Sequence, residues 1–199
     1  MLQKSIKLMW GIAIVGLMGC TTPGGSSDVQ AGFEVTQATV SPGTSVKIDG
    51  KKINLYPGSL RVGDVIKKTL ADYDSIGKVA IVNIVPSVDT PVCEAQTHEL
   101  GESPNIPADI ARVTVSRDLP MAQSRFAKEA KLTNIKYISD YKHAHFGKKS
   151  GLLMQGPELL ARGVLVVDKK GVIRHVQIVP DVVQLPDLKK AIDIARKYR

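Results

Sequence analysis

Apolar residues occur in short blocks along this chain, and their spacing predicts its secondary structure. Residues 79–85 read VAIVNIV, a nearly continuous β-branched run that is typical of a central strand buried on both faces. Apolar residues at helical spacing indicate helices over 92–100 and 121–131, and a third helix after Pro186. Further strands are predicted over 112–116, 136–139, 163–167 and 172–179. Strands and helices therefore alternate through most of the chain.

Two turns containing glycine complete this pattern. Residues 46–48 and 52–54 flank Asp49-Gly50, a strong short-range signal for a β-hairpin. Residues 168–171 (DKKG) join the last two strands, and their glycine is available for a left-handed position. The resulting order predicts an α/β fold in which a mixed central β-sheet is flanked by helices on both faces. This order matches a thioredoxin-like fold with an additional N-terminal β-hairpin.

The first 20 residues predict an export signal instead of a part of the fold. Lys4 and Lys7 precede an apolar stretch over 8–18, which is too short to span a bilayer but long enough for a signal-peptide core. The segment ends in the letters LMGC at Cys20, which resemble the bacterial lipoprotein box. This resemblance implies cleavage before Cys20, a diacylglycerol on its sulfur and acylation of the new amino terminus. A plain secretory signal and an uncleaved anchor are the alternatives.

Residues 21–34 (TTPGGSSDVQAGFE) are small, polar and rich in glycine, as flexible tethers are. The chain is therefore expected to consist of a signal peptide (1–19), a lipid-anchored tether (20–34) and a thioredoxin-like domain (35–199). Thr21, not an aspartate, follows the predicted lipidation site. By resemblance to lipoprotein sorting in double-membraned bacteria, this implies the outer membrane on its periplasmic side.

The composition is that of an ordinary globular protein and excludes several classes. Of 199 residues, 43% are apolar and 23% charged, which excludes a disordered chain and a multi-span membrane protein. The net charge is +8, and removal of the two lysines of the signal segment leaves +6. Aromatic residues make up only 5%, and no basic run is interleaved with stacking rings. A solvated basic surface is therefore favoured over nucleic-acid binding.

Cysteine and histidine are too few to indicate a cofactor or a disulfide framework. The two cysteines, Cys20 and Cys93, cannot form a set of structural bridges. His143 and His145 are two residues apart, and no nearby cysteine or carboxylate pair completes a tetrahedral metal site. We therefore expect no metal and no cofactor. If Cys20 is lipidated, the mature chain holds one free thiol, Cys93.

The clearest candidate for chemistry is the segment PSVDTPVC, which runs from Pro86 to Cys93. It leaves the predicted buried strand and enters a helix, with Thr90 as the N-cap and Pro91 as the first helical residue. Cys93 then lies in the first helical turn, near unpaired N–H groups and the positive end of the helix dipole. Both features favour thiolate over thiol. Position alone leaves a buried, inert cysteine as an equal alternative.

This segment resembles the peroxidatic motif of peroxiredoxins, Pro-x-x-x-Thr-x-x-Cys. The longer string NIVPSVDTPVCEAQT over 83–97 is similar to the thiol peroxidase branch of that superfamily. Two further strings resemble the same branch in the same order, DLPMAQSRF over 118–126 and LARGVLVVD over 160–168. The likeness extends over nearly the whole chain from Val35. It implies a thioredoxin-like fold and the reduction of hydroperoxides at a cysteine.

The resemblance assigns roles to individual residues. Cys93 would be the nucleophile that is oxidised to sulfenic acid. Arg162 would stabilise the thiolate and the peroxide, and Thr90 would hydrogen-bond both the sulfur and the peroxide. Pro86 would cover the pocket and exclude water. The backbone N–H groups of Val92 and Cys93 would hold the leaving oxygen. Two apolar residues near the motif would favour alkyl hydroperoxides, namely Val88 and Phe126.

One departure from the family pattern changes the expected cycle. In the thiol peroxidase branch AQSRF is typically followed by a resolving cysteine, whereas Ala127 stands here. We therefore expect a one-cysteine enzyme that is reduced by an external thiol, from a thioredoxin-like protein or a small molecule. The resemblance also implies a homodimer. A redox sensor that passes oxidation from Cys93 to a partner protein is the alternative. A non-enzymatic interaction module conflicts with the complete set of motif residues.

Overall fold

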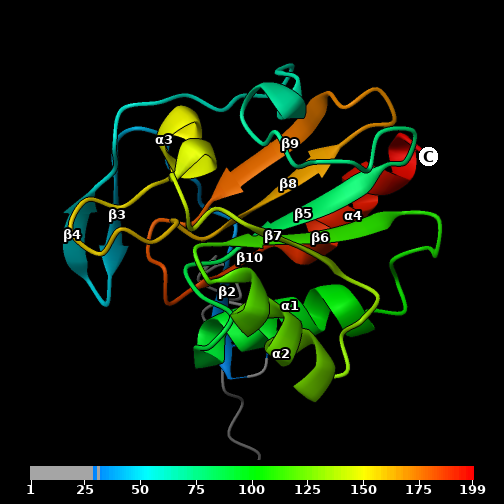
Figure 1. Cartoon of the computed structure of the whole chain (residues 1–199), viewed down its shortest axis with the longest axis horizontal. Helices are drawn as coiled ribbons and strands as arrows, with labels where there is room; N and C mark the ends of the chain where they lie inside the picture. Colours follow the sequence, from blue (N-terminus) through cyan, green and yellow to red (C-terminus); the bar gives the residue numbers. More distant parts are fainter. Residues whose placement is uncertain (1–28, 31) are drawn as a thin grey trace, which may run out of the picture.

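A five-stranded mixed sheet forms the centre of the protein, as seen in a computed structural model that describes residues 29–30 and 32–199 (Figure 1). Its strand order is β7-β6-β5-β8-β9. These strands are β5 (Ala80–Ile84), β6 (Ala111–Ser116), β7 (Lys136–Ser139), β8 (Gly163–Val167) and β9 (Ile173–Ile178). The first three run parallel, while β8 pairs antiparallel with both β5 and β9. Every residue of β5 and β8 is buried, as their continuous apolar sequences predict.

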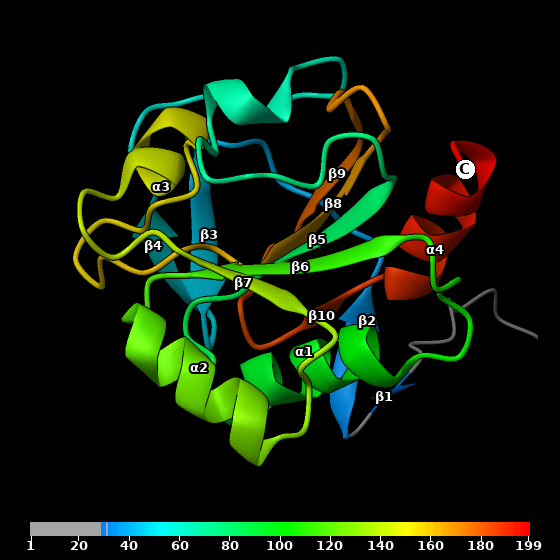
Figure 2. The ribbon, with the colours of Figure 1, turned by 45° about the vertical axis from the view of Figure 1, so that its right-hand side comes forward.

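Helices and loops cover both faces of this sheet (Figure 2). On one face lie α1 (Pro91–Glu102), α2 (Pro120–Glu129) and α4 (Leu188–Lys197), which pack on Ile81, Val164 and Val166. On the other face lie α3 (His145–Ser150) and the 3₁₀ helix η1 (Ile66–Lys68), which pack on Val82 and Leu165. Because successive strand residues point to opposite faces, one strand supplies both cores. The predicted α/β, thioredoxin-like architecture is confirmed.

The predicted hairpin is also present. It consists of β3 (Ser45–Ile48) and β4 (Lys51–Asn54), which pair antiparallel. Both residues of the turn, Asp49 and Gly50, are left-handed, with φ of 50° and 78°. This is the conformation for which Asp-Gly is selected in two-residue hairpins. Gly171 in the last turn is likewise left-handed, with φ of 79°.

The strands and helices predicted from the sequence are all present, and their ends agree within two residues. Two short helices, η1 and α3, were not predicted. Each spans less than two turns, which is too short for an apolar periodicity to be recognised. Three further strands were not predicted either. Two of them have only two residues each, β1 (Val29–Gln30) and β10 (Leu185–Pro186), and the third is β2 (Phe33–Thr36).

Two short strands lie around the expected domain boundary at residue 35. Strand β2 (Phe33–Thr36) crosses it, and β1 lies entirely within the segment that was expected to be a flexible tether. Pairing explains this difference, because β2 is parallel to β10 with Val35 opposite Leu185, and β1 is antiparallel to β2. The predicted signal peptide, Cys20 and residues 21–28 lie outside the described residues. Within the described ranges, no helix has the length and apolar character needed to cross a bilayer.

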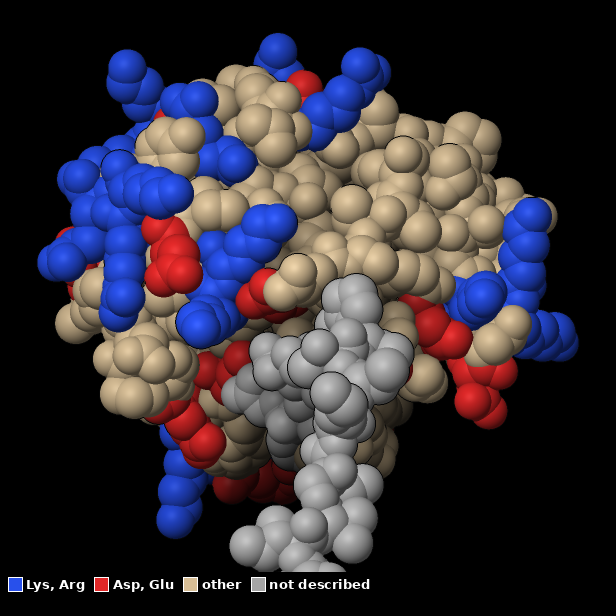
Figure 3. Space-filling model, turned by 180° about the vertical axis from the view of Figure 1, so that it is seen from behind, with Lys and Arg blue, Asp and Glu red and all other residues tan. Residues whose placement is uncertain are grey.

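Charges of both signs are spread over the surface. Figure 3 shows Lys and Arg side chains on the back of the molecule, with Asp and Glu between them and broad uncharged areas beside them. Several cations of the protein have acidic partners, such as Arg174 with Asp168 at 2.7 Å and Arg199 with Asp109 at 2.9 Å. Charges of both signs in this arrangement are typical of a solvated surface with a small excess of basic residues.

Candidate active site

Cys93 lies in the first turn of α1, directly after the loop that leaves β5. Thr90 is the N-cap residue, with extended backbone (φ −138°, ψ 147°), and Pro91 is the first helical residue, as the sequence predicts. The Cys93 side chain is completely buried. Backbone N–H groups in a first helical turn have no acceptor within the helix. The thiol therefore lies beside donors and at the positive end of the helix dipole.

Arg162 reaches the same sulfur from a distant part of the chain. It directly precedes β8, and the antiparallel pairing of β8 with β5 places Gly163 opposite Ile84, close to the start of α1. Its Nη2 donates to Cys93 Sγ at 3.3 Å. Only 2% of the Arg162 side chain is exposed, so this guanidinium is a charge buried next to a thiol.

The electrostatics of Arg162 favour an anion at the sulfur. Burial lowers the pKa of Arg162, because a guanidinium without water loses solvation energy. The Cys93 sulfur opposes this shift and raises the pKa of Arg162 through Coulombic attraction and the hydrogen bond. The two other hydrogen-bond partners of the guanidinium, the Val182 carbonyl and the Gln96 side chain, are neutral. Of these three hydrogen-bond partners, the Cys93 sulfur is the one that can carry a negative charge next to the buried guanidinium.

A buried network of amide and hydroxyl side chains continues from Arg162. Gln96 Oε1 accepts from Arg162 Nη1 at 2.6 Å, and Gln96 Nε2 donates to the Gly163 carbonyl at 3.1 Å and to Asn83 Oδ1. Thr97 Oγ1 donates to the Cys93 carbonyl at 2.7 Å. Because both ends of its amide are occupied, Gln96 orients the guanidinium.

This network was not predicted from the sequence, although signals for it were present. Asn83 is the single polar residue in the VAIVNIV strand. Gln96 follows Cys93 by three residues and Thr97 by four, so all three lie on one helix face. Polar residues on a face that packs against a buried strand need partners, and this requirement was the available signal.

An apolar wall surrounds the other side of the thiol. Val85 and Val88 are buried against Cys93, and Phe126 from α2 and Tyr137 from β7 pack on this group. The two rings meet edge to face, with centroids 6.3 Å apart. Burial raises the pKa of Tyr137 to about 12, so its phenol stays neutral at physiological pH. Val88 and Phe126 were predicted near the substrate, whereas Val85 and Tyr137 were not.

Asp118 fixes the loop that precedes Cys93. Its carboxylate accepts from Ser87 Oγ at 2.7 Å, from Val88 N at 2.8 Å and from Ser116 Oγ at 2.6 Å. Gln123 Nε2 then donates to Ser116 Oγ at 2.8 Å, so that α2 joins the same network. Asp118 and Gln123 both belong to the string DLPMAQSRF over 118–126, so these contacts give that string a structural role.

The Asp118→Ala variant is expected to lose about 2 kcal/mol of unfolding free energy, because a backbone N–H and two hydroxyls lose a charged acceptor. Urea unfolding followed by circular dichroism measures this loss. Asp89→Ala is the matched control, since Asp89 is exposed in the same loop. Equal stability of the two variants would show that Asp118 does not hold the loop.

Comparisons with known proteins identify the family of this chain. Residues 62–192 match the family model described as Redoxin. A thiol peroxidase of Halalkalibacterium halodurans is 35% identical over 161 residues, which cover 76% of this chain and 97% of the relative. A thiol peroxidase of Listeria innocua is 38% identical over 134 residues, 67% of this chain and 80% of the relative. The chain belongs to the peroxiredoxin superfamily, in its thiol peroxidase branch.

The solved structures support the same conclusion about the fold of this thiol peroxidase. A peroxiredoxin-like protein from Aquifex aeolicus superimposes with a TM-score of 0.69 at 27% identity, covering 80% of this chain and 100% of that one. A thiol peroxidase from Chromobacterium violaceum has the same fold, with a TM-score of 0.62 at 15% identity over 77% of this chain and 96% of that one. The similarity to curated thiol peroxidases shows that this chain is a thiol-dependent peroxidase.

Within this thiol peroxidase, Thr90 differs from the expectation. Its side chain is exposed, whereas the Cys93 sulfur is fully buried. Among the hydrogen bonds of the described residues, none joins the Thr90 hydroxyl to Sγ, and this side chain does not cap α1. The Thr90 carbonyl instead accepts from Glu94 N at 2.9 Å, which starts the helix. The expected hydrogen bond from Thr90 to the sulfur is therefore not made here.

Pro86 and Val92 flank the thiol in the chain, at the ends of the segment that connects β5 to Cys93. Pro86 is buried and Val92 is half-buried.

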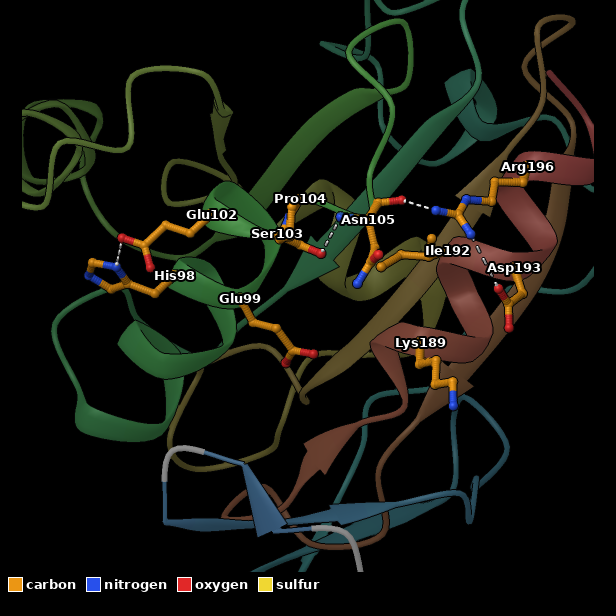
Figure 4. A pocket seen from close by; sticks show the side chains of 10 residues that line it. All are labelled: His98, Glu99, Glu102, Ser103, Pro104, Asn105, Lys189, Ile192, Asp193 and Arg196. Atoms are coloured by element: carbon orange, nitrogen blue, oxygen red, sulfur yellow. Dashed lines mark hydrogen bonds and ion pairs between the residues drawn. The ribbon is translucent and has the colours of Figure 1, made fainter.

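A separate cleft of about 550 Å³ lies between the C-terminal half of α1 and α4 of this thiol peroxidase (Figure 4). Charged side chains line it, including Glu102, Lys189 and Asp193, and Cys93 does not. The cleft is therefore distinct from the thiol site.

Proposed function

We propose that this protein reduces hydroperoxides through a single cysteine, Cys93. The thiolate attacks the terminal oxygen of R–O–OH, the O–O bond breaks, and an S–O bond forms. The leaving alkoxide takes a proton and departs as the alcohol, and Cys93 becomes a sulfenic acid. The observation that supports this step best is the 3.3 Å hydrogen bond from buried Arg162 to Sγ. The guanidinium also stabilises the negative charge that develops on the peroxide oxygens.

The surroundings of the thiol favour organic hydroperoxides alongside hydrogen peroxide. Val88 and Phe126 belong to an apolar wall that an alkyl group contacts favourably. Burial of the site excludes water, which strengthens the electrostatic contribution of Arg162.

Reduction of the sulfenic acid is proposed to depend on an external thiol. Ala127 stands where the family pattern places a resolving cysteine, and Cys93 is the one cysteine in the described part of the chain. A first thiol would condense with the sulfenic acid, releasing water and forming a mixed disulfide. A second thiol would then release Cys93 by exchange and carry away the disulfide.

We further propose that the enzyme works in the cell envelope, anchored through a lipid on Cys20 to the periplasmic side of the outer membrane. The LMGC box and the preceding signal-like segment support this placement. Full-length enzyme expressed in a double-membraned bacterium is expected in the outer-membrane fraction. The Cys20→Ser variant is expected to leave that fraction while its purified form keeps full peroxidase activity, because Cys20 takes no part in the chemistry. Equal membrane retention of both proteins would contradict the anchor.

A homodimer is also proposed, and α2 offers a surface for it. Leu119 and Met121, at the start of this helix, are 43% and 71% exposed and lie two residues apart, so that together they present apolar surface to a second copy. Sedimentation equilibrium of the purified enzyme tests this state, since a monomer at all concentrations would contradict it.

The decisive experiment follows turnover of an organic hydroperoxide by the full chain with dithiothreitol as the reductant. An enzyme consumes many equivalents of peroxide, whereas a sensor that requires a partner protein stops after one. Mass spectrometry of the protein without reductant is expected to show one added oxygen atom at Cys93. Absence of this adduct and of turnover would exclude the proposed function.

A further inference from the structure

The Arg162 guanidinium is held from two different segments of the chain. Its Nε donates to the Val182 carbonyl at 2.7 Å, and its Nη1 donates to Gln96 at 2.6 Å. A guanidinium is a rigid planar fork, so fixing two of its nitrogens also fixes the third. The third nitrogen, Nη2, is the one that reaches Cys93 Sγ. The position of the Val182 carbonyl therefore contributes directly to the contact with the sulfur.

Val182 lies in a segment that depends on a neighbouring element for its position. Residues 179–184 connect β9 to β10 without belonging to a strand of the central sheet, and they pass beside the β3–β4 hairpin (Figure 1). Two backbone hydrogen bonds attach this segment to β3. Lys47 N donates to the Pro180 carbonyl at 2.8 Å, and Val182 N donates to the Lys47 carbonyl at 2.9 Å.

The side chain of Asp181 adds a third attachment at the tip of the hairpin. Its two carboxylate oxygens accept from Gly50 N at 2.8 Å and from Asp49 N at 3.1 Å. Consecutive N–H groups of left-handed residues form a concave site that suits a carboxylate. The same carboxylate accepts from Val183 N at 3.3 Å. Asp181 thus links the hairpin turn to the residues on both sides of the Val182 carbonyl.

We propose that Asp181 is a positioning residue for the peroxidase reaction, holding the Val182 carbonyl where it directs Arg162 toward Cys93. This inference rests on the proposed roles of Cys93 and Arg162. It assigns a catalytic purpose to the N-terminal hairpin, which otherwise lies apart from the thiol. When Asp181 is lost, the segment gains freedom, the guanidinium rotates away from Sγ, and an anionic sulfur loses its positively charged hydrogen-bond partner.

The test measures the second-order rate of Cys93 oxidation by an organic hydroperoxide, in the purified full chain, as a function of pH. Asp181→Ala is expected to lower the rate at pH 7 roughly 10-fold and to move the pH of half-maximal rate upward. Asp181→Asn keeps one acceptor oxygen and is expected to give a pH profile between those of wild type and Asp181→Ala. This variant also keeps the test possible if Asp181→Ala does not fold. Gln155→Ala is the matched control. It removes a hydrogen bond to the Leu55 carbonyl at the end of β4, without touching the Asp181 segment.

A double-mutant cycle with Arg162→Gln separates positioning from general loosening. If Asp181 acts through Arg162, then adding Asp181→Ala to the Arg162→Gln variant changes neither the rate nor the pH profile. A wild-type profile for Asp181→Ala, or an equal effect of Gln155→Ala, would overturn the inference. An undiminished effect of Asp181→Ala in the Arg162→Gln background would overturn it too. Failure of the proposed function is recognised separately, because Arg162→Gln alone would then leave the profile unchanged.

Discussion

The Cys93→Ser variant is expected to lose peroxidase turnover by at least about 1,000-fold. A serine hydroxyl does not ionise near neutral pH and cannot form the sulfenic acid, so no intermediate accumulates. Sulfur and oxygen differ little in size, and the buried site accepts serine without a cavity larger than one atom. Turnover is measured as consumption of an organic hydroperoxide with dithiothreitol, and thermal unfolding verifies that the variant is folded.

Cys20→Ser is the matched control for this experiment, since it removes the other cysteine of the chain. This control is expected to keep the full rate. Residual turnover of Cys93→Ser above the uncatalysed reaction would mean that the chemistry takes place elsewhere in the protein. Equal losses in both variants would contradict a one-cysteine cycle.

The Arg162→Gln variant is expected to react with peroxide about 100-fold more slowly at pH 7, a loss typical of removing one preorganised donor. The sign of the pH effect follows from the contact itself. The Cys93 sulfur raises the pKa of Arg162, because a positive guanidinium and an anionic sulfur attract each other. Without this cation, an anion at the sulfur loses its positively charged neighbour and is less favoured. The rate profile of the variant therefore shifts toward alkaline pH, and the deficit shrinks as pH rises.

Arg112→Gln is the matched control, because it makes the same substitution at a partly buried arginine that lies away from the sulfur. Arg112 on β6 donates to the carbonyls of Leu100 and Ile106, and burial lowers the pKa of Arg112 as it does that of Arg162. Its guanidinium does not contact the sulfur, so its variant is expected to keep the wild-type pH profile. Arg162→Lys retains the charge without the planar fork and is expected to fall between wild type and Arg162→Gln. An unshifted profile for Arg162→Gln would remove the electrostatic basis of the mechanism.

Local sequence determined the central strands, the β3–β4 hairpin, the three longer helices and the place of the nucleophile. The β-branched run at 79–85 has few alternatives to a buried strand, and Asp49-Gly50 suits one type of hairpin turn. Thr90 and Pro91 mark the start of α1, so the sequence alone places Cys93 in a first helical turn. These features depend on residues within a few positions of one another, and local backbone preferences act over that range.

Tertiary structure decided what surrounds the thiol. Arg162 lies 69 residues from Cys93, and it reaches the sulfur because β8 pairs antiparallel with β5 in one register. Without the family resemblance, no local pattern links these two residues. Tyr137 and Val182 contribute through contacts between elements that are distant in the sequence. Strand register and the packing of helices set such contacts. Register and packing depend on how residues from the whole chain fit together in the core, and a short window of sequence does not include those residues.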